Sequence, residues 1–141
     1  MSATRYALDT NVLSELRRTT PDPAVARWSR SVSVTDLFLP AVVLMELRHG
    51  AALIRQRGDA PQADGLETWI DGLVVTFDGR VLDFTADAAQ FAATLTSRPD
   101  APGLADIMIA ATAQVHGMPV ATRNVQDFAR TGVAVLNPWE S

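Results

Sequence analysis

The sequence of 141 residues contains no cysteine and no lysine. Without cysteine, disulfide bonds, thiolate metal sites and cysteine nucleophiles are excluded. Without lysine, all 12 basic residues are arginine, and 16 acidic residues outnumber them, giving a net charge of −4. A broad basic face for nucleic acid is therefore not expected, and binding of nucleic acid would need a local arginine cluster, a metal ion or a second subunit.

Long hydrophobic runs are also missing. No apolar stretch approaches the roughly 18 residues that a membrane-spanning helix needs, and the first residues lack the apolar segment of a secretory signal. Together with the absence of disulfides, this predicts a cytoplasmic protein. The length predicts one domain over residues 1–141, and a hydrophobic content of 48% is enough for a substantial core.

Short apolar runs alternate with longer helical patterns along the chain. We predict five strands, at 5–8, 37–39, 80–82, 119–122 and 133–136, and helices at 10–18, 23–30, 41–57, 63–73, 86–95 and 104–116, with a loop at 58–65. This alternation favours an α/β fold with a mainly parallel sheet and helices on both faces. Active sites of such sheets lie beyond the carboxyl ends of the strands, where Asp9 and residues 123–124 are expected.

Three acidic residues, Asp9, Glu46 and Asp106, stand among apolar neighbours. Burial of a carboxylate is costly unless it is paired or holds a metal ion. Each also has a plain structural interpretation, because Asp9 and Asp106 can cap helices and Glu46 can face solvent. A fourth acid, Asp127, precedes Phe128 and fits a turn as well as a functional role.

A divalent cation would relieve the repulsion between these carboxylates if they gather at one edge of the sheet. Ligands that are all oxygen suit Mg²⁺ or Mn²⁺ rather than Zn²⁺. His49 and His116 are not spaced like a zinc pair, and we interpret them as a helix-surface residue and a residue at a helix C-terminus.

Five segments together resemble the PIN domains of the VapC toxin group, and the FitB-like branch in particular. They are residues 8–16 (LDTNVLSEL), 44–50 (LMELRHG), 104–113 (LADIMIAATA), 120–124 (VATRN) and 135–139 (VLNPW). The resemblance implies a three-layer, Rossmann-like PIN domain. It also implies a magnesium-dependent endoribonuclease that hydrolyses phosphodiester bonds of single-stranded or structured RNA as the toxin of a type II toxin–antitoxin pair.

The same resemblance assigns the site residues. Asp9 and Asp106 would bind the ion directly, and Glu46 would complete the shell or orient a bound water. The fourth position stays open between Asn124 and Asp127.

Polar residues beside these acids would support the site. The hydroxyls of Thr10 and Thr122 would hold carboxylates or phosphate oxygens, with Asn11 beside them. Arg123 would contact phosphate or lie as an ordinary arginine on the surface.

The resemblance also implies partners. These are the RNA substrate, a VapB-like or FitA-like antitoxin, a second copy of the chain, and DNA only through the antitoxin; no membrane is implied. Trp28 and Trp69 are candidate interface residues, although a core position is the better interpretation for both.

Other small α/β folds fit less well. A phosphoacceptor receiver domain needs a late lysine, a dehalogenase-like phosphatase needs a second acid where Asn11 stands, and glycine-rich nucleotide-binding motifs are missing. An alternative of another class is a largely non-catalytic subunit that joins an antitoxin in a DNA-bound repressor complex.

Overall fold

A computed structural model, which describes residues 3–141, contains one sheet of five parallel strands. The strands lie in the order β3-β2-β1-β4-β5 and are β1 (Tyr6–Leu8), β2 (Leu37–Pro40), β3 (Val81–Leu82), β4 (Val120–Ala121) and β5 (Val135–Leu136). The prediction of an α/β fold with a parallel five-stranded sheet is therefore confirmed.

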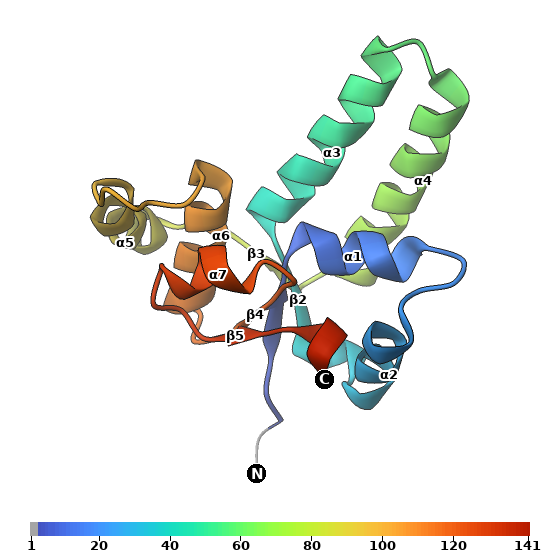
Figure 1. The fold of residues 1–141 in the computed structure, drawn as a ribbon. Coiled ribbons are helices and arrows are strands. Elements are labelled where there is room, and N and C mark those ends of the chain that lie inside the picture. The colour runs from blue at the N-terminus through green and yellow to red at the C-terminus, as the bar shows by residue number, and fades with distance from the viewer. Residues whose placement is uncertain (1–2) are drawn as a thin grey trace.

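Seven α-helices surround the described sheet: α1 (Thr10–Arg17), α2 (Pro23–Ser31), α3 (Ala41–Gln56), α4 (Ala60–Thr76), α5 (Ala86–Thr96), α6 (Leu104–Val115) and α7 (Val125–Ala129). Figure 1 shows α1, α2 and α4 on one side of the strands and α5, α6 and α7 on the other. Helices α3 and α4 form an antiparallel hairpin that extends beyond the sheet (Figure 1). The sheet is thus covered on both faces, as a parallel sheet requires.

Three differences from the predicted elements have local causes. Helix α4 begins at Ala60, inside the predicted loop 58–65, because the Asp59 carboxylate caps it by accepting from the Gln62 amide at 3.2 Å and Pro61 suits a first helical turn. Helix α7 and the 3₁₀ turns η1 (Val34–Asp36) and η2 (Pro138–Glu140) were not predicted. Elements of three to five residues are too short to show a helical period.

The hydrophobic core lies between the sheet and the helices. Its fully buried side chains include Leu8, Leu39 and Phe128. Trp28 is 5% exposed and meets Tyr6 edge to face, with 5.4 Å between ring centroids, so it is a core residue. Trp69 is half-buried against the same core, and the guanidinium of Arg17 lies over its ring.

The strand order reverses direction between β1 and β4. The chain adds β2 and β3 on one side of β1 and then β4 and β5 on the other. Ligand sites of open α/β sheets lie at such a point, beyond the carboxyl ends of the strands. Asp9 follows β1 and Thr122 follows β4, so both lie at this point. Within residues 3–141, no helix has both the length and the apolar character needed to cross a membrane.

Candidate active site

Asp9 stands at the carboxyl end of β1 and caps the N-terminus of α1. Its backbone amide donates to the Ala121 carbonyl at 3.0 Å, which continues the pairing with β4, and its Oδ1 accepts from the Thr10 amide at 2.8 Å. The residue is only 3% exposed. Burial raises the pKa of Asp9, the bonds from Thr122 and Thr10 lower it, and the charge of Glu46 raises it further, with a net upward shift.

A network of short bonds fixes the Asp9 carboxylate to the loop after β4. Thr122 is fully buried, and its hydroxyl donates to Asp9 Oδ2 at 2.8 Å and accepts from the Asn124 amide at 2.9 Å. Asn11 Nδ2 lies 3.3 Å from both Asp9 Oδ2 and Thr122 Oγ1, and Asn11 Oδ1 accepts from the Arg123 amide at 3.2 Å. The first turn of α1 and the β4–α7 loop are therefore held as one unit around Asp9.

Glu46 joins this unit from α3. Its Oε1 accepts from the Thr10 hydroxyl at 2.8 Å, although the two residues are 36 positions apart in sequence. Glu46 is partly buried, and its charge contributes to the raised pKa of Asp9. The solvent-facing interpretation of Glu46 does not describe this geometry. Thr10 and Thr122 both hold carboxylates, which is one of the two roles expected for them.

Asp106 lies in the first turn of α6, and the charges of three other acids act on its pKa. Its pKa is raised from 3.8 to about 6, first by burial and then by the charges of Asp9, Asp127 and Glu46. Charges act in this way only when they are near one another. Asp9 after β1, Glu46 in α3 and Asp127 in α7 therefore lie within electrostatic range of Asp106 in α6.

The fourth position remains a choice between two neighbours on one short segment. Asp127, in α7, contributes to the raised pKa of Asp106, and its own ion pair with Arg130 is long, at 4.0 Å between exposed side chains. The Asn124 side chain makes no hydrogen bond to other residues in the range 3–141, while its amide is tied to Thr122. The electrostatic link to Asp106 favours Asp127.

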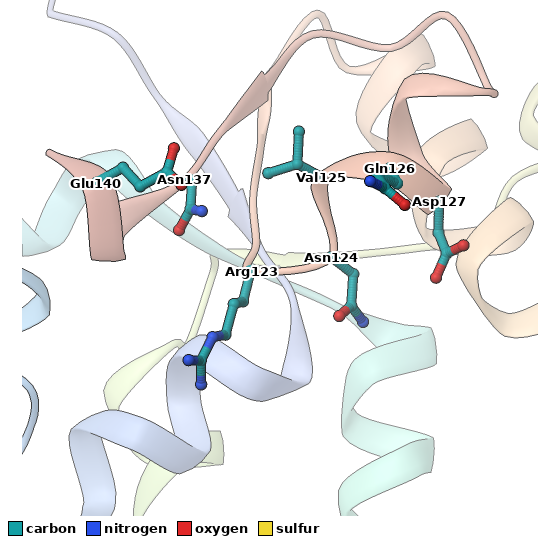
Figure 2. A pocket seen from close by; sticks show the side chains of 7 residues that line it. All are labelled: Arg123, Asn124, Val125, Gln126, Asp127, Asn137 and Glu140. Carbon is teal, nitrogen blue, oxygen red and sulfur yellow. The ribbon is translucent and has the colours of Figure 1, made fainter.

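A pocket of about 510 Å³ lies beside Asp127, the one of the four acids that lines it. Its walls are residues 123–127 on one side and Asn137 and Glu140 of the C-terminal segment on the other, and we name it the polar pocket (Figure 2). Arg123 is exposed at its edge, and the guanidinium carbon lies 5.2 Å from the centroid of the Trp139 ring. The sequence reasoning assigned no role to Gln126, Asn137 or Glu140. Asn137 lies within residues 135–139, which match the family pattern, whereas Gln126 and Glu140 carry no such signal.

The donor set fits a hard divalent cation. The groups are carboxylate oxygens, and among residues 3–141 none of Asp9, Glu46 and Asp106 has an arginine or histidine within ion-pair distance. No three His, Asp or Glu side chains of the described chain are arranged to enclose a metal ion by themselves. Mg²⁺ does not need such a cage, because it usually keeps several waters and binds one or two carboxylates together with substrate phosphates.

The two histidines lie away from this arrangement. His49 is exposed on α3, and His116 caps the C-terminus of α6, with Nδ1 2.8 Å from the Thr112 carbonyl oxygen. Both positions agree with the structural interpretations given to them.

Comparison with known proteins gives consistent matches. The PIN domain family matches residues 6–134. VapC ribonuclease Y4jK of Sinorhizobium fredii is 38% identical over 138 residues, which cover 94% of this chain and 96% of the relative. Toxin FitB of Neisseria gonorrhoeae is 36% identical over 134 residues, again covering 94% and 96%. In the solved structure of FitAB bound to an IR36 DNA fragment, one chain superposes with a TM-score of 0.83 at 34% identity, covering 95% of each chain.

Proposed function

The chain belongs to the PIN domain family, and on that basis we propose that it is a magnesium-dependent endoribonuclease acting as the toxin of a toxin–antitoxin pair. The observation that carries the proposal is that Thr10 donates its backbone N–H to Asp9 and its hydroxyl to Glu46, which brings these two carboxylates together. The charges of Asp9, Asp127 and Glu46 also help to raise the pKa of Asp106 to about 6. Among residues 3–141, Asp9, Glu46 and Asp106 have no basic side chain within ion-pair distance, and such a concentration of negative charge is suited to a cation and to a substrate that needs one. With RNA as its proposed substrate, the chain would act in the cytoplasm.

The surroundings of the four acids differ, and each set of contacts fits a different role. Asp9 is held by three donors and has a fixed direction, and its charge acts on Asp106 in α6. These two residues would hold Mg²⁺ (or Mn²⁺) directly. The ion would supply a lowered pKa for a bound water and would offset charge that grows on the phosphate.

Glu46 and Asp127 would act on water around these two residues. The Thr10 hydroxyl occupies one oxygen of Glu46, so the other oxygen is available to orient the attacking water or to accept its proton. Asp127, which is more exposed, would complete the acidic site on the α7 side. The side chain of Asn124 beside it would hydrogen-bond a water.

The direct test is cleavage of single-stranded RNA with Mg²⁺ by the wild type, Asp9→Asn and Asp106→Asn. Each substitution keeps the side-chain shape and removes one charge, and we expect a loss of at least about a hundredfold in rate because the two acids hold the same ion. Asp87→Asn, an exposed first-turn acid of α5, is the matched control and should keep wild-type activity. A chelator should abolish cleavage, and equal activity in all four proteins would refute the proposal.

We further propose that the chain pairs with itself and with a FitA-like or VapB-like antitoxin. Large apolar side chains are exposed on the α3–α4 hairpin, including Met45 at 55% and Val75 at 77%. The acidic edge would accept a basic segment of the antitoxin. The similarity to the FitAB complex supports the antitoxin partner, and contact with DNA would come through the antitoxin.

A second candidate function is that of a non-catalytic subunit in a DNA-bound repressor. Asn124 favours it, because an amide at a position where the resemblance allows an acid weakens the case for four carboxylate ligands. Gel-shift of promoter DNA by the complex, together with no chelator-sensitive RNA cleavage by the free chain, would support this function over the ribonuclease.

A further inference from the structure

The polar pocket is large enough for part of a nucleotide and carries hydrogen-bonding groups that the protein itself does not use. At about 510 Å³ it lies within the size range of small-molecule sites. Within residues 3–141, the side chains of Asn124 and Gln126 make no hydrogen bond, and Asn137 uses only its oxygen, which accepts from the Trp139 amide at 3.0 Å. The whole side-chain amides of Asn124 and Gln126 and the NH₂ group of Asn137 are therefore available to a ligand.

The walls of the polar pocket have a mixed character. The Asp127 and Glu140 carboxylates both line it, and Val125 adds an apolar surface. Figure 2 shows Arg123, Asn124 and Asp127 extending to one side of their loop and Val125 to the other. The guanidinium carbon of Arg123 lies over the Trp139 ring, which holds a planar cation at the edge of the pocket.

This chemistry favours one part of an RNA, the nucleobase, over the phosphate. Two carboxylates disfavour a phosphate group inside the pocket. Amides that both donate and accept match the edge of a nucleobase, carboxylates accept from an exocyclic amino group, and a guanidinium plane stacks on a base. An arginine side chain of a protein partner carries donors alone, so it would pair with the carboxylates but could not accept from the amide NH₂ groups of Asn124, Gln126 and Asn137, whereas a nucleobase can.

The position of the pocket connects it to the acidic site. Asn124 and Asp127 belong to both. The backbone N–H of Asn124 donates to the Thr122 hydroxyl, which in turn donates to Asp9. We propose that the polar pocket binds a nucleobase of the RNA adjacent to the bond that is cut, and that it favours a base with an exocyclic amino group. This inference rests on the proposed function for its substrate, and it makes the C-terminal segment a determinant of sequence preference.

The first experiment measures binding without cleavage. The full-length ¹⁵N-labelled chain is titrated with cytidine and with uridine, which differ at the amino-bearing edge and carry no phosphate. We expect cytidine to shift the side-chain amide resonances of Asn124, Gln126 and Asn137, and uridine to bind at least about fivefold more weakly, the lower end of the discrimination that a good base contact provides. Equal binding of both nucleosides would overturn the base preference, and no shift of these amides by either nucleoside would overturn the pocket.

A variant pair isolates the carboxylate. Glu140→Gln places an amide, which both donates and accepts, where only an acceptor stood, so the preference for cytidine over uridine should fall toward one. Asp100→Asn, an exposed acid in the loop before α6, is the matched control and should keep the wild-type preference. Glu140 is exposed at the end of the chain, so its substitution leaves the core intact.

The second experiment separates the pocket from the catalytic proposal. RNA oligomers that differ only by cytidine or uridine next to the cut are compared by kcat/KM for the wild type and Glu140→Gln. Nucleoside binding without any RNA cleavage would retain the pocket and refute the ribonuclease. Cleavage that is indifferent to the neighbouring base in both proteins would retain the ribonuclease and refute the pocket. A short arginine peptide that shifts the three amides when neither nucleoside does would assign the pocket to a protein partner.

Discussion

At the scale of single residues, Asp106 has a measurable cost to the fold when no cation is bound. Its pKa is raised from 3.8 to about 6, so between these values the folded chain binds more protons than the unfolded chain. The stability that protonated Asp106 contributes is complete below the pKa of 3.8 in the unfolded chain and is lost as pH rises through the pKa of about 6 in the folded chain. The sign is opposite to that of a carboxylate stabilised by an ion pair.

Asp106→Asn, which cannot ionise, should therefore be more stable than the wild type in chelator near neutral pH. We expect a difference of about 1 kcal/mol, discounted because the carboxyl is partly exposed, and its disappearance below about pH 4. Urea unfolding in chelator at the two pH values measures the difference, with Asp87→Asn as the exposed control. A wild type that is more stable than Asp106→Asn near neutral pH would contradict the electrostatic account.

Thr122 is a positioning residue, because it acts through the Asp9 carboxylate. Thr122→Val keeps the shape but removes the hydroxyl that donates to Asp9 Oδ2 and accepts from the Asn124 amide. We expect RNA cleavage to fall by about tenfold or more, as for other residues that orient a metal ligand. Loss of a donor should also raise the pKa of Asp9, so the acid limb of the pH–rate profile should move to higher pH.

Thr122→Ser restores the hydroxyl and should restore both the rate and the pH profile. A purely structural role would lower stability in the valine variant but would leave the pH profile in place. This second readout distinguishes positioning from packing.

The residues that the sequence singles out most clearly are those whose surroundings are unusual. Asp9, Glu46 and Asp106 stand in apolar runs, and all three reach the same edge of the sheet. Glu140 carries no such signal, because an exposed acid near the end of a chain is ordinary. Its place in the polar pocket depends on β5 pairing with β4, a contact that no local pattern encodes.

At the scale of elements, Arg80 connects segments that strand pairing alone does not hold. Its Nη1 donates to the carbonyls of Val34 and Leu37 at 2.6 and 2.5 Å, and its Nη2 donates to the Thr76 carbonyl at 2.6 Å. The guanidinium also lies over the Phe77 ring, 4.9 Å from its centroid. One side chain thus joins η1, the start of β2 and the C-terminus of α4.

Arg80→Met keeps the length of the side chain and removes every donor, so three carbonyls lose a charged partner. We expect a loss of about 2 kcal/mol in the free energy of unfolding, the usual size for hydrogen bonds to a charged group. Urea denaturation measures it. Arg130→Met is the control, because its 4.0 Å ion pair to Asp127 joins two exposed side chains and should contribute less than about 0.5 kcal/mol. Equal losses in the two variants would argue against the role of Arg80.

Elements with a strong period were predicted within one or two residues, as for α3 and α6. The start of α4 was missed because Gly58, Asp59 and Pro61 indicate a loop and a helix cap equally well until the cap bond to Gln62 is seen. Helix α7 was missed because five residues cannot show a period. It carries Asp127 and part of one wall of the polar pocket, so an element without a readable period contributes to both.

At the scale of the whole molecule, the chain has a net charge of −4 and concentrates four carboxylates where β1 meets β4. Folding brings these charges together, so a cation that binds them stabilises the folded chain and not the unfolded one. The stabilisation follows the ratio of free ion to dissociation constant and reaches about 2.7 kcal/mol at a hundredfold ratio.

Mg²⁺ should therefore raise the melting temperature of the wild type by about 4 °C or more, measured against NaCl of equal ionic strength so that screening is matched. Asp9→Asn and Asp106→Asn should lose most of this rise, while Asp87→Asn should keep it. Because the ion competes with protons and the pKa of Asp106 is about 6, the rise should also shrink as pH is lowered through that value. An equal rise in wild type and Asp106→Asn would locate the ion elsewhere on the chain. If Mg²⁺ does not raise the melting temperature of the wild type, the acidic edge does not bind this cation, even if the fold and the network around Asp9 are as described.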